Sequence, residues 1–156
     1  TLEDLAEVAE GGRKIVFGAS ARARVAASRR DLLKAASSGA PLYGVNTGFA
    51  ELASRRIPDD QLKTLQRNLV LSHSCGVGPL LEASEARGMV YLRANELARG
   101  FSGVRPELVE ALVRVFNSGM APAVPSRGSL GASGDLAPQA HVALLLIGEG
   151  KASCPG

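Results

Sequence analysis

The sequence predicts a mainly α-helical protein with at most short strands. Its 156 residues include 18 glycines and 8 prolines, which divide the chain into helix-length segments. Within one of these segments apolar residues recur at the spacing of one helix face: Leu108, Leu112, Val115 and Phe116. Hydrophobic residues make up 46% of the chain, enough to bury a core in one domain of this size. We therefore expect a single domain over residues 1–156.

The predicted elements begin with a helix capped by Thr1. Asp4 completes an approximate capping box, and the glycines at 11–12 are expected to end this helix. The next residues, Lys-Ile-Val-Phe at 14–17, are predicted to form a short strand. A second helix, rich in arginine and alanine, is expected over 20–38 because a glycine follows it directly.

Two further helices are predicted in the middle of the chain. The Pro-Asp pair at 58–59 is a start signal for a helix that runs to about Cys75. Either Glu82 or Ser84 opens the next one, which Gly100 ends. The segment between residue 39 and this pair is expected to be a loop.

The last part of the sequence predicts two helices joined by an extended segment. Pro106 stands at a first helical position, and Gly119 follows the last apolar residue of that helix. Residues 120–129 contain two prolines and are expected to be extended. The final helix, 136–147, is apolar on nearly every face, so we expect it to be buried all round, in a large core or between subunits.

Composition argues against a nucleic-acid-binding, membrane-spanning or metal-binding protein. The net charge is +3, but basic residues are scattered among acidic ones, and aromatic residues reach only 4% with no tryptophan, which argues against a nucleic-acid surface. No apolar run is long enough to cross a bilayer, and residues 1–30 lack the apolar stretch of a signal peptide, so a cytoplasmic protein is expected. Cys75 and Cys154 show no metal-ligand spacing with the two histidines; no metal is expected, and both thiols should be reduced.

Residues 128–138, Gly-Ser-Leu-Gly-Ala-Ser-Gly-Asp-Leu-Ala-Pro, carry the most specific chemistry. Gly134 has no Cβ, so its amide nitrogen can approach the carbonyl carbon of Ala132 in a tight turn and close a five-membered ring. Loss of water, and of the Ser133 hydroxyl with its α-proton, would leave an electrophilic methylene conjugated to an imidazolone. Asp135 is placed to cap the following helix. The Ala-Ser-Gly triplet alone is also typical of a flexible turn.

Two other segments contain candidate site residues. The loop at 42–50, Leu-Tyr-Gly-Val-Asn-Thr-Gly-Phe-Ala, presents Tyr43, although a lone tyrosine is usually a packed aromatic. Ser72 and His73 lie near the end of a predicted helix, where a histidine commonly complements the helix dipole. His141 falls on the apolar last helix, where a structural role is expected.

Together the three segments resemble the signature of the aromatic amino acid ammonia-lyase and aminomutase family. The resemblance covers essentially the whole chain and implies the methylidene-imidazolone cofactor, MIO, formed without another enzyme from Ala132-Ser133-Gly134. It implies that Tyr43 removes the substrate's β-proton, with Asn46, Gly48 and Asp135 in supporting roles. Ala50 departs from the pattern, because many members have glycine there.

The same resemblance implies the substrate. In this family the dipeptide at Ser72-His73 faces the substrate side chain, and histidine lyases tend to have Ser-His there. The implied reaction is non-oxidative elimination of ammonia from L-histidine to give urocanate. A tyrosine ammonia-lyase or a tyrosine 2,3-aminomutase with the same cofactor is an alternative. A catalytically silent helical assembly domain is an alternative from another class.

The resemblance also bears on architecture and partners. It implies the helical N-terminal domain of the fumarase/aspartase-like fold of this family, without the C-terminal helical part that completes the site. Active sites in the family are shared between subunits of a homotetramer. This chain alone is therefore expected to be inactive, and its expected partners are an amino acid substrate and further copies of the full-length protein.

Overall fold

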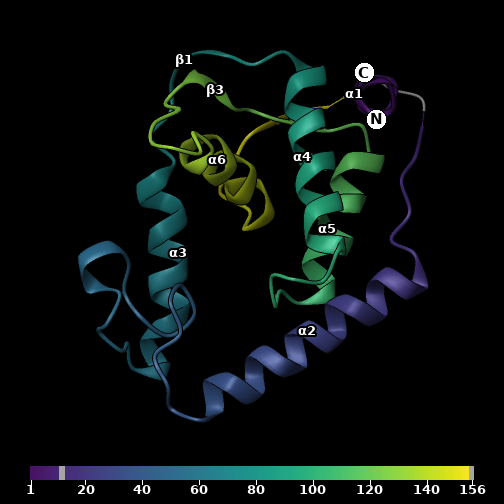
Figure 1. Ribbon diagram of the computed structural model, residues 1–156. Coiled ribbons are helices and arrows are strands. Elements are labelled where there is room, and N and C mark those ends of the chain that lie inside the picture. The colour runs from purple at the N-terminus through teal and green to yellow at the C-terminus, as the bar shows by residue number, and fades with distance from the viewer. Residues whose placement is uncertain (11–12, 155–156) are drawn as a thin grey trace.

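The computed structural model describes residues 1–10 and 13–154 and confirms the mainly α-helical class (Figure 1). The helices of the described residues are α1 (Leu2–Glu10), α2 (Ala19–Ser37), α3 (Leu62–His73), α4 (Ala83–Ala98), α5 (Pro106–Asn117) and α6 (Leu136–Leu146), with 3₁₀ turns at Ala50–Leu52 and Asp59–Gln61. The strands are short: β1 (Val77–Leu80), β2 (Ala121–Pro122), β3 (Pro125–Arg127) and β4 (Ala152–Ser153).

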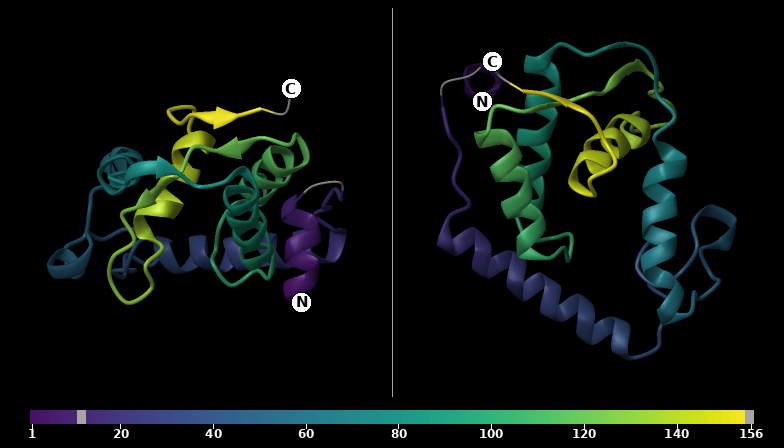
Figure 2. Two further views of the ribbon diagram at one scale, coloured as in Figure 1. Left: turned by 90° about the horizontal axis from the view of Figure 1, so that it is seen from above. Right: turned by 180° about the vertical axis from the view of Figure 1, so that it is seen from behind.

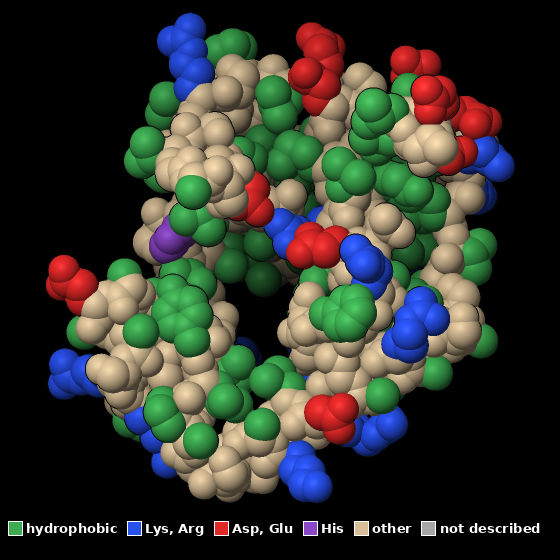
Figure 3. Space-filling model, viewed as in Figure 1, with side chains coloured by type: hydrophobic (Ala, Val, Ile, Leu, Met, Phe, Trp, Pro, Cys, Tyr) green, Lys and Arg blue, Asp and Glu red, His purple; other side chains and the backbone are tan. Residues whose placement is uncertain are grey.

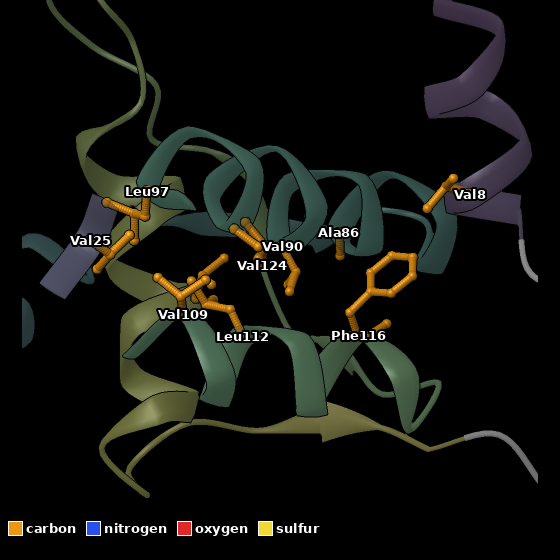
Figure 4. Close-up of a cluster of buried hydrophobic side chains, with 12 residues drawn as sticks. Val8, Val25, Ala86, Val90, Leu97, Val109, Leu112, Phe116 and Val124 are labelled. Atoms are coloured by element: carbon orange, nitrogen blue, oxygen red, sulfur yellow. The ribbon is translucent and has the colours of Figure 1, made fainter. Parts of the chain in front are cut away.

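The helices form two groups that α2 spans. In Figure 1, α3 and α6 lie on one side, α4 and α5 lie on the other, and α2 crosses below them. The hydrophobic core is centred on the α4–α5 pair, where Val90, Leu112 and Phe116 are almost completely buried (Figure 4). Burying a side chain of this size stabilises the fold by about 1.5–3 kcal/mol. The larger part of the core lies between α4 and α5, away from α3.

The predicted helix boundaries are confirmed in most places. The Asp4 amide donates to Thr1 Oγ1 (3.2 Å), which is the expected N-terminal cap of α1. Glu82, and not Ser84, caps α4, because Glu82 and Glu85 form a reciprocal capping box. Pro106 occupies the first position of α5. The expected end of the first helix at 11–12 lies outside the described residues.

The predicted strand at 14–17 is wrong. This segment is irregular, and the side-chain amide of Asn117 takes the place of a neighbouring strand. Asn117 Oδ1 accepts from the Ile15 amide and Asn117 Nδ2 donates to the Ile15 carbonyl, both at 2.9 Å. One side chain at the end of α5 thus satisfies both backbone groups, and no ladder is needed.

Residues 120–129 are extended as predicted, and their pairing positions the site. β1 pairs antiparallel with β3, with Val77 opposite Arg127, and β2 pairs antiparallel with β4. β1 follows α3 directly, and β3 leads into the connection before α6. The β1–β3 pair therefore holds the end of α3 next to the start of the 128–135 connection.

The last helix is apolar but is not buried all round within this chain. Only Ala137, Ala140 and Val142 of α6 are buried, and Leu136 is 60% exposed. The described residues cover α6 mainly from α3 and β2, so its remaining apolar surface is open. Figure 3 shows exposed hydrophobic side chains on the displayed face, with acidic and basic side chains distributed among them. Within the described ranges, no helix is both long and apolar enough to cross a membrane.

Candidate active site

The Ala132-Ser133-Gly134 triplet lies in the turn between β3 and α6. Gly134 has a φ of +71°, and a Cβ added to it would lie 2.7 Å from Ser129 Oγ. Ser129 Oγ donates to the Gly134 carbonyl at 2.7 Å, which fixes this peptide. Glycine is therefore required at 134 both for its backbone conformation and for its close approach. A residue without a Cβ at 134 is also what the predicted ring closure requires.

The prediction that the Asp135 side chain caps α6 is wrong, and Asp135 contacts Arg93 and Ser133 instead. It stands at the N-terminal cap position of α6, but its carboxylate makes no capping hydrogen bond. Instead Oδ1 accepts from Ser133 Oγ at 2.7 Å, and Oδ2 pairs with Arg93 at 3.2 Å. The Ser133 hydrogen bond is the main cause that lowers the pKa of Asp135, and Arg93 lowers it further against partial burial. The sequence did not single out Arg93, because it lies on a distant helix.

Tyr43 is presented at the surface of its loop. Its side chain is 65% exposed and meets Phe49 edge to face, with ring centroids 5.8 Å apart. The interpretation of Tyr43 as a packed core aromatic is therefore excluded for this chain. Figure 2 (left) shows that segment 40–57 and the 128–135 connection lie on the same side of α3.

Asn46 and Gly48 shape the Tyr43 loop. Asn46 is 3% exposed; its Oδ1 accepts from the Leu42 amide at 2.7 Å and its Nδ2 donates to the Ala40 carbonyl at 3.0 Å. A Cβ at Gly48 would lie 2.6 Å from the Leu52 Cβ, so a larger residue would push the loop apart. Both residues support the loop backbone.

Helix α3 connects the Tyr43 loop with the Ser72-His73 dipeptide. Gln66 Nε2 donates to the Gly44 carbonyl at 3.2 Å, so the loop is attached to the middle of α3. Ser72 and His73 are the last two residues of that helix. His73 lies seven positions after Gln66, which is about 10 Å along the helix axis.

The His73 ring is oriented by its own helix. His73 Nδ1 lies 2.9 Å from the Leu69 carbonyl and 3.1 Å from Ser72 Oγ. Because a carbonyl only accepts, Nδ1 carries the proton in the neutral ring, and Nε2 is left as an acceptor. Nδ1 thus interacts with the end of its own helix, as the helix-end interpretation expects.

His141 has the structural role expected for it. Its Nε2 accepts from the Gly76 amide at 3.1 Å and so ties α6 to the residues after α3. The Gly128 backbone passes close by, since a Cβ at Gly128 would lie 3.0 Å from the Gly76 Cα. Burial lowers the pKa of His141, because the charged ring is poorly solvated there.

A pH-dependent stability follows from His141. The pKa of His141 lies below the ordinary value of 6.5 in the folded state. Its contribution to the free energy of unfolding is therefore present above pH 6.5 and is lost as the pH falls through the pKa of the folded state. His141→Gln keeps an acceptor for Gly76 but does not titrate. We expect the Tm of the wild type to fall more than that of the variant between pH 7 and pH 5. Equal falls in a thermal melt series would contradict this role.

One cavity in the described part of the chain lies away from these groups. A cavity of about 370 Å³ opens between α2, α4 and α5, with Arg24, Tyr91 and Asn95 in its lining. None of the candidate site residues lines it. Ser133 and Tyr43, which carry the reactive hydroxyl groups, are both exposed on the surface of this chain.

Comparison with known proteins identifies the family. The aromatic amino acid lyase family matches residues 1–156. The chain belongs to this family. A histidine ammonia-lyase of Sorangium cellulosum is 52% identical to this lyase chain over 159 residues, covering 100% of the chain and 31% of the relative. The chain thus spans about a third of the length of that relative.

Two solved lyase-family structures show the same fold. Tyrosine aminomutase from Streptomyces globisporus superposes with a TM-score of 0.90 at 42% identity, covering 100% of this chain and 29% of the other. Histidine ammonia-lyase from Trypanosoma cruzi gives 0.87 at 39% identity, covering 99% and 30%. The helical lyase fold predicted from the sequence is thus confirmed.

Proposed function

We propose that this chain is the N-terminal domain, residues 1–156, of a histidine ammonia-lyase that converts L-histidine to urocanate and ammonia. The observation that carries the proposal is the Ser72-His73 dipeptide at the end of α3, on the helix that also holds the Tyr43 loop. The identity of 52% with a relative named histidine ammonia-lyase supports it.

The cofactor proposed for this lyase is MIO, held as residues 132–134. When formed, it would supply an electrophile to which the substrate binds covalently, by its amine or by its ring. The covalent bond would make the elimination easier, although ammonia is a poor leaving group. The φ of +71° at Gly134 and the Ser129 contact with its carbonyl support formation at this turn. The dipole at the start of α6 favours negative charge on the ring oxygen.

The other proposed site residues bind the substrate or transfer a proton. Tyr43 is proposed to remove the β-proton of the substrate, since its phenol is exposed on an ordered loop. His73 Nε2 is proposed to accept a hydrogen bond from the substrate imidazole, because Nδ1 is already engaged by Leu69. Ser72 holds the His73 ring from the side.

The open site supports a larger assembly. Charge that develops during elimination is stabilised best where water is excluded, but Tyr43 and Ser133 are exposed in this chain. We propose that the rest of the full-length protein and further subunits of a homotetramer, located in the cytoplasm, close the site. The open apolar surface of α6 supports this, because such a surface is stable only when covered.

The similarity to tyrosine aminomutase, at a TM-score of 0.90, keeps a second reaction open. A tyrosine ammonia-lyase or a tyrosine 2,3-aminomutase would use the same residues, and an imidazole such as His73 can also meet a phenol. A silent assembly domain would retain the fold without the cofactor. A product assay on histidine, tyrosine and phenylalanine separates these functions.

Replacement of His73 tests the proposed preference for histidine. In the full-length protein, His73→Phe should lower kcat/KM for histidine roughly 10²-fold and improve phenylalanine relative to histidine, because a hydrogen-bonding partner becomes an apolar ring. His141→Gln is the matched control and should keep the order of preference. A wild type that prefers tyrosine or yields β-tyrosine would overturn the histidine assignment.

A further inference from the structure

Arg93 joins α4 to the first turn of α6. Its guanidinium donates to Asp135 Oδ2 at 3.2 Å, to Gln139 Oε1 at 3.3 Å and to Glu96 Oε2 at 2.8 Å. The Arg93 side chain is only 26% exposed, and its guanidinium contacts three polar side chains. Asp135 lies 42 residues along the chain from it. Gln139 and Glu96 hold the guanidinium through its other nitrogens, so the one N–H that binds Asp135 Oδ2 has a fixed direction.

The two oxygens of Asp135 divide their contacts between Arg93 and the triplet. With Oδ2 on the arginine, Oδ1 faces the Ser133 hydroxyl at 2.7 Å. The Ser133 side chain is exposed, and without this bond its hydroxyl would sample three rotamers. The chain of contacts from Arg93 through Asp135 therefore selects one direction for the Ser133 Cβ–Oγ bond.

We propose that Arg93 is a positioning residue for the conversion of Ala132-Ser133-Gly134 into the cofactor, acting through Asp135 on the Ser133 hydroxyl. This inference rests on the proposed function, because it concerns how the cofactor is made. Arg93 is not a catalytic residue in this account, since it touches none of the reacting atoms.

The chemistry shows why the direction of the hydroxyl matters. A bond forms between Gly134 N and the Ala132 carbonyl carbon, and the carbonyl oxygen leaves as water with the protons of Gly134 N and Ser133 N. Next the Ser133 Cβ–Oγ bond breaks and its α-proton leaves, so that hydroxide and proton make a second water and a Cα–Cβ double bond forms. This elimination is fastest when the breaking bonds are aligned. The contact with Asp135 exists only before that step, because Oγ then departs.

The experiment follows maturation in the full-length protein. Cell-free synthesis defines the starting time of maturation. Intact mass at successive times then records the loss of two waters, about 36 Da. Arg93→Met keeps the long apolar stem but removes the donors, and we expect maturation roughly fivefold slower or more. Arg93→Lys restores a cation that reaches one carboxylate oxygen and should recover most of the rate. Glu96→Gln removes only the other ion pair of Arg93 and should mature like the wild type.

A double-mutant cycle tests the route through Asp135. In an Asp135→Asn background the change Arg93→Met should cause little further slowing, because the partner of Arg93 is already altered. Wild-type rates in folded Arg93→Met, or Arg93→Lys as slow as Arg93→Met with an equal loss in Tm, would overturn the positioning role. A wild type that never loses mass would instead overturn the proposed cofactor itself.

Discussion

Replacing Ser133 with alanine is expected to lower the turnover of the full-length protein on the order of 10⁴-fold or more, because the group proposed to bind the substrate covalently cannot form. The fold should survive, since Ser133 is exposed and its one side-chain hydrogen bond is to Asp135. The measurement is the steady-state release of urocanate from histidine, followed beside a thermal melt.

Ser126→Ala is the matched control for this result. Ser126 is an exposed serine in β3, shortly before the same connection, and lies outside the triplet. It should keep wild-type turnover. Substantial urocanate release by Ser133→Ala would show that the reaction proceeds without the proposed electrophile.

Removing the Tyr43 hydroxyl should have the second largest effect. Tyr43→Phe keeps the ring that meets Phe49 but deletes the group proposed to take the β-proton. We expect kcat to fall on the order of 10²-fold or more with folding unchanged. Comparison of kcat at saturating histidine, with the melting temperature as a check, measures this.

Tyr91→Phe removes a phenolic hydroxyl elsewhere, on α4 beside the Phe116 ring, and serves as its control. That variant should retain the wild-type kcat. If Tyr43→Phe also retained it, with the same dependence on pH, Tyr43 would be a wall of the site and not its base.

The sequence predicts the helices well because their signals are local. A capping glutamate three residues before its partner, or a proline at a first helical position, can be read directly, as Glu82 and Pro106 show. The ring closure proposed at 132–134 can also be inferred from a local motif, because it involves adjacent residues only. Family and fold followed from these short motifs.

The missed features depend on contacts between distant residues. Segment 14–17 has the composition of a strand, but the side chain of Asn117, 102 residues from Ile15, supplies its hydrogen bonds. Asp135 has the sequence position of a helix cap, but its two carboxylate oxygens bind Arg93 and Ser133 instead. Nothing local in the sequence marks such pairs, so the supporting contacts of the site emerged only from the fold.

The proposed conversion of residues 132–134 into an electrophile would change the mass of the intact protein. The full-length wild-type protein should be about 36 Da lighter than its sequence, with the deficit located in the peptide that contains Ser133 and absent from Ser133→Ala. A wild-type protein that converts histidine to urocanate at its unmodified mass would show that the reaction does not use this electrophile.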